Sequence, residues 1–249
     1  MKETTIQFPA EEVTLPSKGL LYPKDSPLSK GVIEMKYMTA KEEDILTNAN
    51  LISNGTVIDK LLQSLIVTDF NYDNLLLGDK NAILVAARIL GYGPDYSFNY
   101  RGESLQVDLS TLKDKLMDES LVIDGKNEFS FTLPTSKREV IFKLVTHSDE
   151  KKIEQELKGL KKINKNSSPE LTTRMKHQMV SVDNNRESKF IRDFIDNEFL
   201  ARDARELRKY IRKIQPDVDL SHEYEDGNGN TITIDIPVGV RFFWPDASI

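Results

Sequence analysis

The stretch LGDKNAILVAARILGYGP at residues 77–94 sets the centre of the predicted fold. Asp79 is a favoured helix N-cap, and Gly91, Gly93 and Pro94 are residues at which helices stop, so we expect a helix between them. Its apolar side chains lie on most sides of the helix rather than in one stripe: Ile83, Leu84, Ala87, Ile89 and Leu90. A helix that is apolar nearly all round is usually buried, which predicts a central place in the core.

Further helices are predicted on both sides of this stretch. Upstream, Thr39 and Glu42 form a capping box that starts a helix at Ala40, and Thr56 starts a second one. Downstream, apolar residues at helical spacing predict helices over 148–163, through Met175 and Met179, through 190–195 and over 200–214.

Alternating apolar and polar residues predict a strand at 32–38 and three hairpins. The hairpins span 96–109, 128–147 and 224–236, and each has a polar or glycine-containing turn near its middle. The fold class that follows is α+β: a helical core with short antiparallel β-hairpins and an extended, proline-rich N-terminal arm. Pro9, Pro16, Pro23 and Pro27 disfavour a helix in that arm.

The predicted domain organisation has one seam. Residues 1–31 form the extended arm, and 32–163 form an α+β lobe with two hairpins. The polar run NKNSS at 164–168 is a linker. Residues 169–249 form a C-terminal helical lobe with the final hairpin and an aromatic C-terminus.

Composition excludes several classes of protein. The formal net charge is −6, which argues against a chain-wide nucleic-acid or anionic-membrane surface. Cysteine is absent, so disulfides and thiolate metal sites are excluded. The start of the sequence has no apolar signal region and no run is long enough to span a membrane, so we expect a soluble, unexported protein.

No pattern of catalytic, cofactor-binding or metal-ligating residues is evident. His147, His177 and His222 are far apart, and none has a partner at ligand spacing. The carboxylates of 193–206 alternate with basic residues, as on helix faces that pair charges among themselves. The Gly-x-Gly pairs lack the third glycine of a nucleotide loop. We therefore expect a protein that is not an enzyme and that carries no cofactor and no metal.

Three groups of side chains are candidates for partner contact. Extended arms add strands to neighbours or wrap around them, aromatic clusters supply hot spots, and arginine pairs bidentately with carboxylates at interfaces. The basic cluster is expected to be partly intramolecular and partly partner-facing. It lacks the interleaved exposed aromatic residues of a nucleic-acid patch. The candidates are Phe8, Leu15 and Tyr22 in the arm, Arg202, Arg205 and Arg208 in the basic cluster, and Phe242, Phe243 and Trp244 at the C-terminus. Of the last three, we expect one phenylalanine ring to close the core and another aromatic side chain to remain available.

Several blocks, read together, resemble the baseplate hub proteins and hub assembly factors of T-even-type contractile-tailed bacteriophages. The blocks, in chain order, are LPSKG at 15–19, MTAKEEDIL at 38–46, LGDKNA at 77–82, ARILGYG at 87–93, VSVD at 180–183, ARDAR at 201–205, PDVDL at 216–220 and FFWP at 242–245. Many members of that family carry Cys-x-x-Cys pairs in hairpins that correspond to 96–109 and 222–236. This chain has none there, which predicts hairpins closed by tight turns and no structural metal.

The resemblance implies a structural component of the baseplate hub, or a hub assembly factor, that acts through protein–protein contacts. The implied partners are other hub and tail proteins, with no nucleic acid and no membrane. The resemblance is also compatible with a homo-oligomer. The implied location is the host cytoplasm during assembly and, for a structural subunit, the tail baseplate of the virion. A tail assembly chaperone absent from the finished virion is the alternative. A tail-tip hydrolase is the alternative from another class, and it would need a buried acid pair or a metal triad that no motif indicates.

Overall fold

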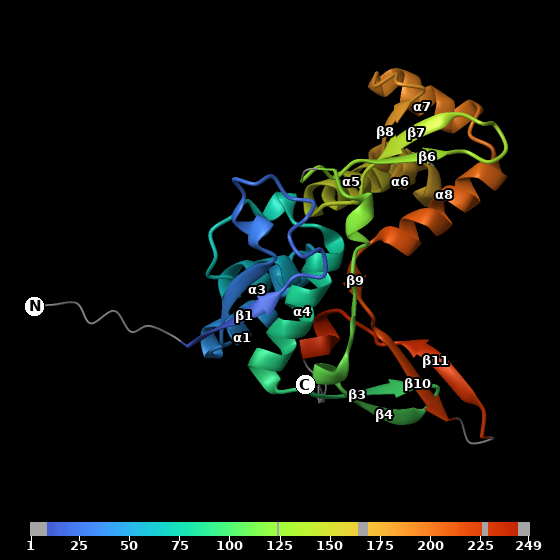
Figure 1. The fold of residues 1–249 in the computed structure, drawn as a ribbon. Coiled ribbons are helices and arrows are strands. Elements are labelled where there is room, and N and C mark those ends of the chain that lie inside the picture. The colour runs from blue at the N-terminus through green and yellow to red at the C-terminus, as the bar shows by residue number, and fades with distance from the viewer. Residues whose placement is uncertain (1–8, 124, 164–168, 226–228, 244–249) are drawn as a thin grey trace, which may run out of the picture.

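The computed structural model describes residues 9–123, 125–163, 169–225 and 229–243 of the chain. These residues form a mixed α+β structure with small antiparallel sheets, which confirms the α+β part of the predicted fold class (Figure 1). The α-helices of the described part are α1 (Ala40–Leu46), α2 (Ala49–Ser53), α3 (Val57–Leu65), α4 (Leu77–Tyr92), α5 (His147–Ile163), α6 (Glu170–Gln178), α7 (Ser188–Asn197) and α8 (Ala201–Ile214). Short 3-10 helices lie between them, among them η1 (Pro27–Lys30), η2 (Tyr72–Asn74) and η5 (Val240–Phe243). No helix of the described residues is long and apolar enough to cross a membrane.

The strands form small antiparallel sheets. Four sheets have two strands each and pair β1 (Ala10–Thr14) with β2 (Val32–Lys36), β3 (Asp95–Tyr100) with β4 (Glu103–Asp108), β5 (Asp114–Lys115) with β9 (Asp217–Val218), and β10 (Ser221–Glu225) with β11 (Thr231–Asp235). The fifth has three strands in the order β6 (Phe129–Thr132), β7 (Glu139–Phe142) and β8 (Met179–Val182). Two of these sheets pair segments that are far apart in sequence.

Helix α4 is buried along most of its length, as its sequence predicts. Its start differs from the prediction: the helix begins at Leu77, and Asp79 lies in the first turn instead of capping it. The N-terminal turn passes very close to the chain before β9, because a Cβ on Gly78 would lie 1.8 Å from the carbonyl oxygen of Pro216. Gly93, with φ of 83°, ends the helix. The close approach at Gly78 ties the central helix to the C-terminal third of the chain.

The N-terminal segment does not project as an extended arm, which corrects the prediction for the residues described from Pro9 onward. Strand β1 pairs with β2, with Val13 opposite Ile33. The apolar side chains that follow are buried in the core: Leu15, Leu21, Tyr22 and Leu28. These residues are irregularly spaced, so a periodic pattern does not predict their burial. Removing each side chain from water nevertheless stabilises the folded state. Residues 1–8 lie outside the described part.

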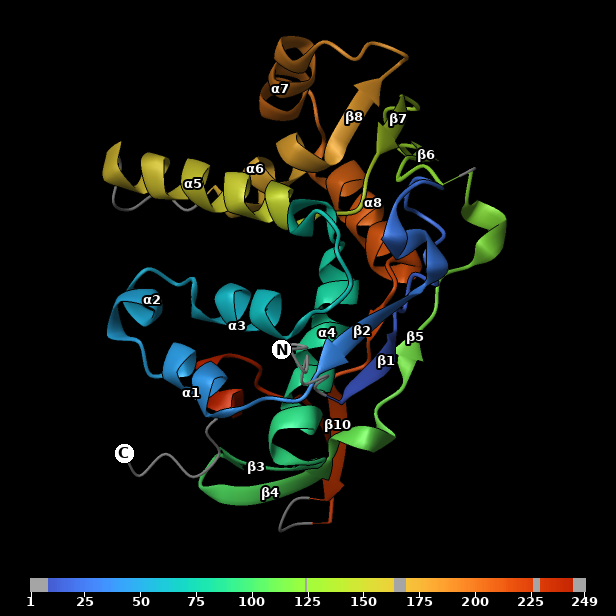
Figure 2. The same ribbon diagram turned by 90° about the vertical axis from the view of Figure 1, so that its left-hand side faces the viewer.

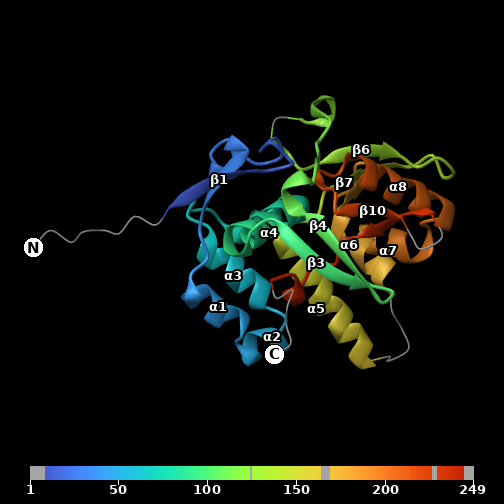
Figure 3. The same ribbon diagram turned by 90° about the horizontal axis from the view of Figure 1, so that it is seen from below.

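Two predicted hairpins are confirmed and lie next to each other. Hairpin β3–β4 turns at Arg101 and Gly102, whose φ values are 50° and 92°. Hairpin β10–β11 has the predicted strands, and its turn at 226–228 lies outside the described residues. Figures 1 and 3 show the two hairpins side by side at one end of the molecule. The Tyr100 and Tyr224 rings meet edge to face there, with their centroids 5.8 Å apart.

The grouping of elements in space differs from the predicted seam at 164–168. Figures 1 and 2 show one group made of α5 to α8 with β6 to β8, and a second group made of α1 to α4 with the remaining hairpins. The helix expected to run through Met179 ends at Gln178, and Met179 opens strand β8, which extends the β6–β7 hairpin. The second group thus combines residues from both predicted lobes, since β9 to η5 return to it. The run at 164–168 lies outside the described residues.

The C-terminal aromatic run closes the core, as predicted for one of its phenylalanine rings. Phe242 and Phe243 lie in η5, and both side chains are fully buried. Arg88 of α4 holds this turn, because its Nε donates to the carbonyl oxygen of Phe242 at 3.0 Å. Its Nη1 and Nη2 donate to the carbonyl oxygens of Gly93 and Asp95. The guanidinium therefore binds three carbonyl groups and joins the loop after α4 to the C-terminal turn.

Candidate functional site

Helix α8 is strongly amphipathic. One face is apolar and packs into the molecule through Ala204, Leu207, Ile211 and Ile214. Tyr210 stacks on Phe131 of β6, with ring centroids 4.9 Å apart. Because residues three and four apart share a helix face, this packing leaves the basic residues between them on the outside.

The start of α8 is fixed by a buried carboxylate. Asp203 accepts hydrogen bonds from the backbone N–H groups of Thr135 (2.7 Å) and Ser136 (2.9 Å), in the turn between β6 and β7. Burial alone would raise the pKa of Asp203, but these bonds outweigh burial and lower it. The sequence predicts that Asp203 is one of several mixed surface charges. In the structure it is buried, and its hydrogen bonds hold the start of α8 against the β6–β7 turn.

The outer face of α8 carries the predicted basic cluster, which we call the α8 basic face. Its exposed members are Arg202, Arg205, Lys209, Arg212 and Lys213, and Arg208 is half-buried beside them. Within the described residues, the ion pair recorded on this face joins Lys209 Nζ to Glu206 Oε1 at 2.8 Å. This bond, with the nearby Arg205 and Arg202 charges, lowers the pKa of Glu206. The predicted contact residues Arg202, Arg205 and Arg208 are therefore brought together on one surface.

Chemically, this face is suited to binding carboxylates. Guanidinium groups donate paired, planar hydrogen bonds to carboxylates, and several of them in a row create a positive potential that attracts acidic surfaces. A further cation lies at the C-terminal end of the helix, where Lys115 of β5 donates to the carbonyl oxygen of Arg212. The face is exposed and positively charged, and none of its cations lines the hollow described below.

The other predicted contact residues do not join this surface. Leu15, Tyr22, Phe242 and Phe243 are at most 4% exposed, so they cannot offer an open surface to a partner, which corrects that expectation. Phe8 and Trp244 lie outside the described residues. Both phenylalanine rings lie in the core, where the sequence predicts one of them.

Tyr22 belongs instead to a buried anchor around Asp79. The Asp79 carboxylate accepts from Ser17 N–H (2.9 Å), Ser17 Oγ–H (2.6 Å) and Tyr22 O–H (2.6 Å). Tyr22 Oη in turn accepts from the N–H of Leu76 at 3.0 Å. Burial raises the pKa of Asp79, and the three donors only partly offset it. The anchor joins Ser17 and Asp79, which are 62 residues apart, and sequence spacing does not reveal this contact.

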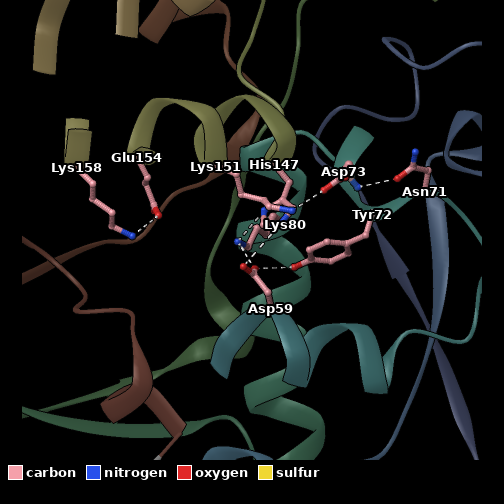
Figure 4. Close-up of polar contacts among 9 residues, drawn as sticks. All are labelled: Asp59, Asn71, Tyr72, Asp73, Lys80, His147, Lys151, Glu154 and Lys158. Atoms are coloured by element: carbon pink, nitrogen blue, oxygen red, sulfur yellow. Dashed lines mark hydrogen bonds and ion pairs between the residues drawn. The ribbon is translucent and has the colours of Figure 1, made fainter. Parts of the chain in front are cut away.

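A second polar cluster links the two groups of elements (Figure 4). Asp59 of α3 pairs with Lys80 of α4, with Oδ1 and Nζ 2.5 Å apart, and Tyr72 of η2 donates to the same oxygen at 3.2 Å. His147 at the start of α5 lies 3.4 Å from Lys80 Nζ through Nδ1 and 3.7 Å from Asp59 Oδ2 through Nε2. Beside this cluster, Lys151 of α5 forms an ion pair with Asp73 of η2.

This cluster has the residue types of acid–base chemistry but the geometry of a structural contact. Burial lowers the pKa of His147, the attraction of Asp59 opposes that shift, and the Lys80 charge adds to it. The imidazole is only 4% exposed and packs edge to face on Tyr72, with centroids 4.7 Å apart, so a substrate would have no access to it. We interpret the cluster as a structural contact that joins α3, α4 and α5.

The other two histidines offer no catalytic arrangement either. His177 Nε2–H donates to the Glu156 carboxylate at 2.9 Å, and Arg192 donates two hydrogen bonds to the same carboxylate. The Arg192 bonds lower the pKa of Glu156 to about 2. His222 lies in β10. Nowhere in the described part of the chain do three or more His, Asp or Glu side chains gather as metal ligands would. The prediction that the protein carries no metal stays a prediction.

One hollow of about 510 Å³ lies between the N-terminal loop and η2. Its wall combines apolar Leu21, Pro23, Pro27 and Leu76 with Asn71, Asn74 and Asn127, and Asp25 is the single carboxylate among the described lining residues. Both the amide oxygen and the amide nitrogen of Asn127 are bonded to the backbone of Leu144. The hollow therefore holds no acid–base pair.

Comparison with protein-family models, with curated proteins and with solved structures finds no match to this chain. The sequence blocks and the α8 basic face are therefore the features of this chain that indicate a function.

Proposed function

We propose that this protein helps to build a phage tail baseplate hub by binding other proteins, as a hub subunit or as a hub assembly factor. The sequence blocks supply the biological setting. The observation that carries the binding role is the α8 basic face, where no ion pair is recorded among the described residues for Arg202, Arg205, Arg212 or Lys213. Glu206 and Asp118 feel some of these charges, but neither forms an ion pair with them.

Folding alone does not account for such a face. Like charges three or four residues apart on a helix destabilise it by about 0.2 to 0.5 kcal/mol per pair. The spacing of Arg202, Arg205, Lys209 and Arg212 places several such pairs on α8. The repulsion is relieved when an acidic partner covers the face, because each guanidinium then gains a counter-charge.

An acidic protein surface fits this face better than a nucleic acid. Single-stranded nucleic acids are held by exposed aromatic side chains between the cations, and the aromatic residue of α8, Tyr210, packs inward on Phe131. The whole chain also carries a net charge of −6, which repels phosphate at longer range.

The test is a pull-down from phage-infected cells, with the bound proteins identified by mass spectrometry. Arg202→Glu combined with Arg205→Glu should reduce capture of hub and tail proteins at least tenfold relative to the wild-type chain. The matched control is Lys161→Glu with Lys162→Glu on the exposed end of α5, which makes the same change in net charge away from α8.

Circular dichroism must show that both variants remain folded. Equal capture by the wild type and both variants would contradict a role for α8, and capture of nucleic acid with steep salt dependence would favour the other class of partner. Mass spectrometry of purified virions then separates a hub subunit, which is present, from an assembly factor or chaperone, which is absent.

A further inference from the structure

We infer that the α8 basic face of one copy docks on the outer face of hairpin β10–β11 of a second copy, in a head-to-tail contact. This inference rests on the proposed binding role of α8 and names its partner as the same chain. The observations behind it are the separation of charge along the sequence, the exposure of both faces and their placement in the fold.

Charge separates sharply just after α8. Residues 201–213 contain six basic and two acidic residues, a balance of +4, whereas 214–240 contain six acidic residues and no lysine or arginine, a balance of −6. A net charge of −6 for the whole chain conceals this dipole. Neighbouring segments of opposite charge are a sequence signal for electrostatic docking.

The acidic segment displays its charge on one face of hairpin β10–β11. Tyr224 pairs with Ile232, and His222 pairs with Ile234, so one face of the hairpin carries these rings and aliphatic chains. The opposite face alternates with them and carries Glu223, Glu225 and Asp235, all exposed, beside Ser221 and two threonines. Since the segment has no basic residue, these carboxylates have no cation on their own hairpin.

The two faces lie on different parts of the molecule, because α8 runs from the β6–β8 sheet toward the middle and the hairpin lies at one end (Figures 1 and 2). Figures 1 and 2 place α8 with β6 to β8 in one group, and hairpin β10–β11 beyond the β5–β9 pair at the far end of the other group. After α8, Asp217 and Val218 pair with β5. This pairing holds the segment that connects the basic face to the acidic hairpin. Opposite charges held apart in this way can meet only between copies.

The dimensions of the two faces agree. Arg202 and Arg212 are ten residues apart on α8, about 15 Å along the helix axis. The acidic face extends from the Ser221–Asp235 pair to Glu225, four residues or about 14 Å along the strand. A helix lying along the hairpin would therefore bring at least three cations opposite the three carboxylates.

The contact is heterologous, because it joins different surfaces of the two copies. Each copy keeps one free basic face and one free acidic face, so the contact repeats until a ring closes or a filament grows. Since both faces are exposed, the association should weaken as salt screens the charges. The overall negative charge of the chain acts against it at long range.

Charge reversal on each face provides the test, with size-exclusion chromatography and light scattering at low ionic strength. The first variant carries Arg202→Glu, Arg205→Glu and Arg212→Glu, and the second carries Glu223→Lys, Glu225→Lys and Asp235→Lys. We expect the wild type to form oligomers that dissociate in high salt. Each variant alone should be monomeric, because its two faces then carry the same sign. An equimolar mixture of the two should assemble again, because each variant supplies the face that the other lacks.

A wild-type chain that stays monomeric at high micromolar concentration and low salt would overturn the inference. Wild-type oligomers that persist in either variant would overturn it too, as would a mixture that stays monomeric. The proposed function fails separately: a chain that does not self-associate but still captures hub proteins through α8 refutes the second copy as partner only. A wild-type chain that self-associates but captures no hub or tail protein through α8 refutes the hub role only.

Discussion

Replacing Asp79 with alanine should strongly destabilise the protein, because this carboxylate joins the N-terminal segment to the central helix. The substitution leaves three buried donors without an acceptor: Ser17 N–H, Ser17 Oγ–H and Tyr22 O–H. Each stranded donor costs about 1 to 3 kcal/mol, and relief from burying a carboxylate offsets part of the sum. We expect a loss of about 3 to 5 kcal/mol in the free energy of unfolding.

Urea unfolding followed by circular dichroism measures this loss. Asp79→Asn keeps one acceptor oxygen and should lose roughly half as much. Asp69→Asn on an exposed loop is the matched control, with an expected change within about 0.5 kcal/mol. Hydrogen exchange should locate the damage in residues 15–22 and in the first turn of α4. If Asp79→Ala behaves like the control, the anchor does not stabilise the fold.

The same residue predicts a pH dependence. Burial holds the pKa of Asp79 above its ordinary value, so the folded state binds more protons than the unfolded state. Its stabilising contribution is complete below the unfolded pKa, about 3.9, and is lost as pH rises through the folded pKa. The stability difference between wild type and Asp79→Asn should therefore be largest near pH 4 and shrink toward neutrality. A difference that grows with pH would contradict this reasoning.

Three more changes test other parts of the structure. Gly78→Ala would place a methyl group 1.8 Å from a carbonyl oxygen, whereas Gly159→Ala meets nothing within 4 Å. We expect thermal unfolding to show a loss of more than about 4 kcal/mol for the first and a gain of up to about 1 kcal/mol for the second. Arg88→Met strands three carbonyl groups and should cost about 3 kcal/mol in urea unfolding, and a near-neutral result would contradict its linking role. Because burial lowers the pKa of His147, the folded state binds fewer protons, and stability should fall as pH drops below about 6.5. His147→Gln should flatten that part of the stability–pH curve, and an unchanged curve would refute the assignment.

Local features of this protein could be predicted well from sequence. Thr39 bonds to Glu42 through its own N–H at 3.0 Å, and the helix begins at Ala40 as the capping box predicts. Arg101 and Gly102 make the expected turn, since both take positive φ. These outcomes depend on neighbours within about four residues, which is the range over which sequence patterns act.

Contacts between distant segments could not be predicted in the same way. Strand β8 forms because Met179 to Val182 meet the free edge of β7, and no local pattern distinguishes that run from the end of a helix. The sequence predicts that the arm is available for partners and that one terminal phenylalanine is in the core, yet Tyr22 and both phenylalanines are buried, with hydrogen-bond partners far away in the sequence.

For the candidate site, the sequence by itself determined which charges gather and on which helix. Helical spacing places Arg202, Arg205 and Arg208 near one another, whatever the rest of the chain does. Only the tertiary structure decided that this face is open. Asp203 turns inward to the β6–β7 loop, Tyr210 stacks on the sheet, and the acidic hairpin is held at one end of the molecule. The physical reason is range: helical periodicity acts over a few residues, whereas burial and charge separation depend on which distant surfaces pack together.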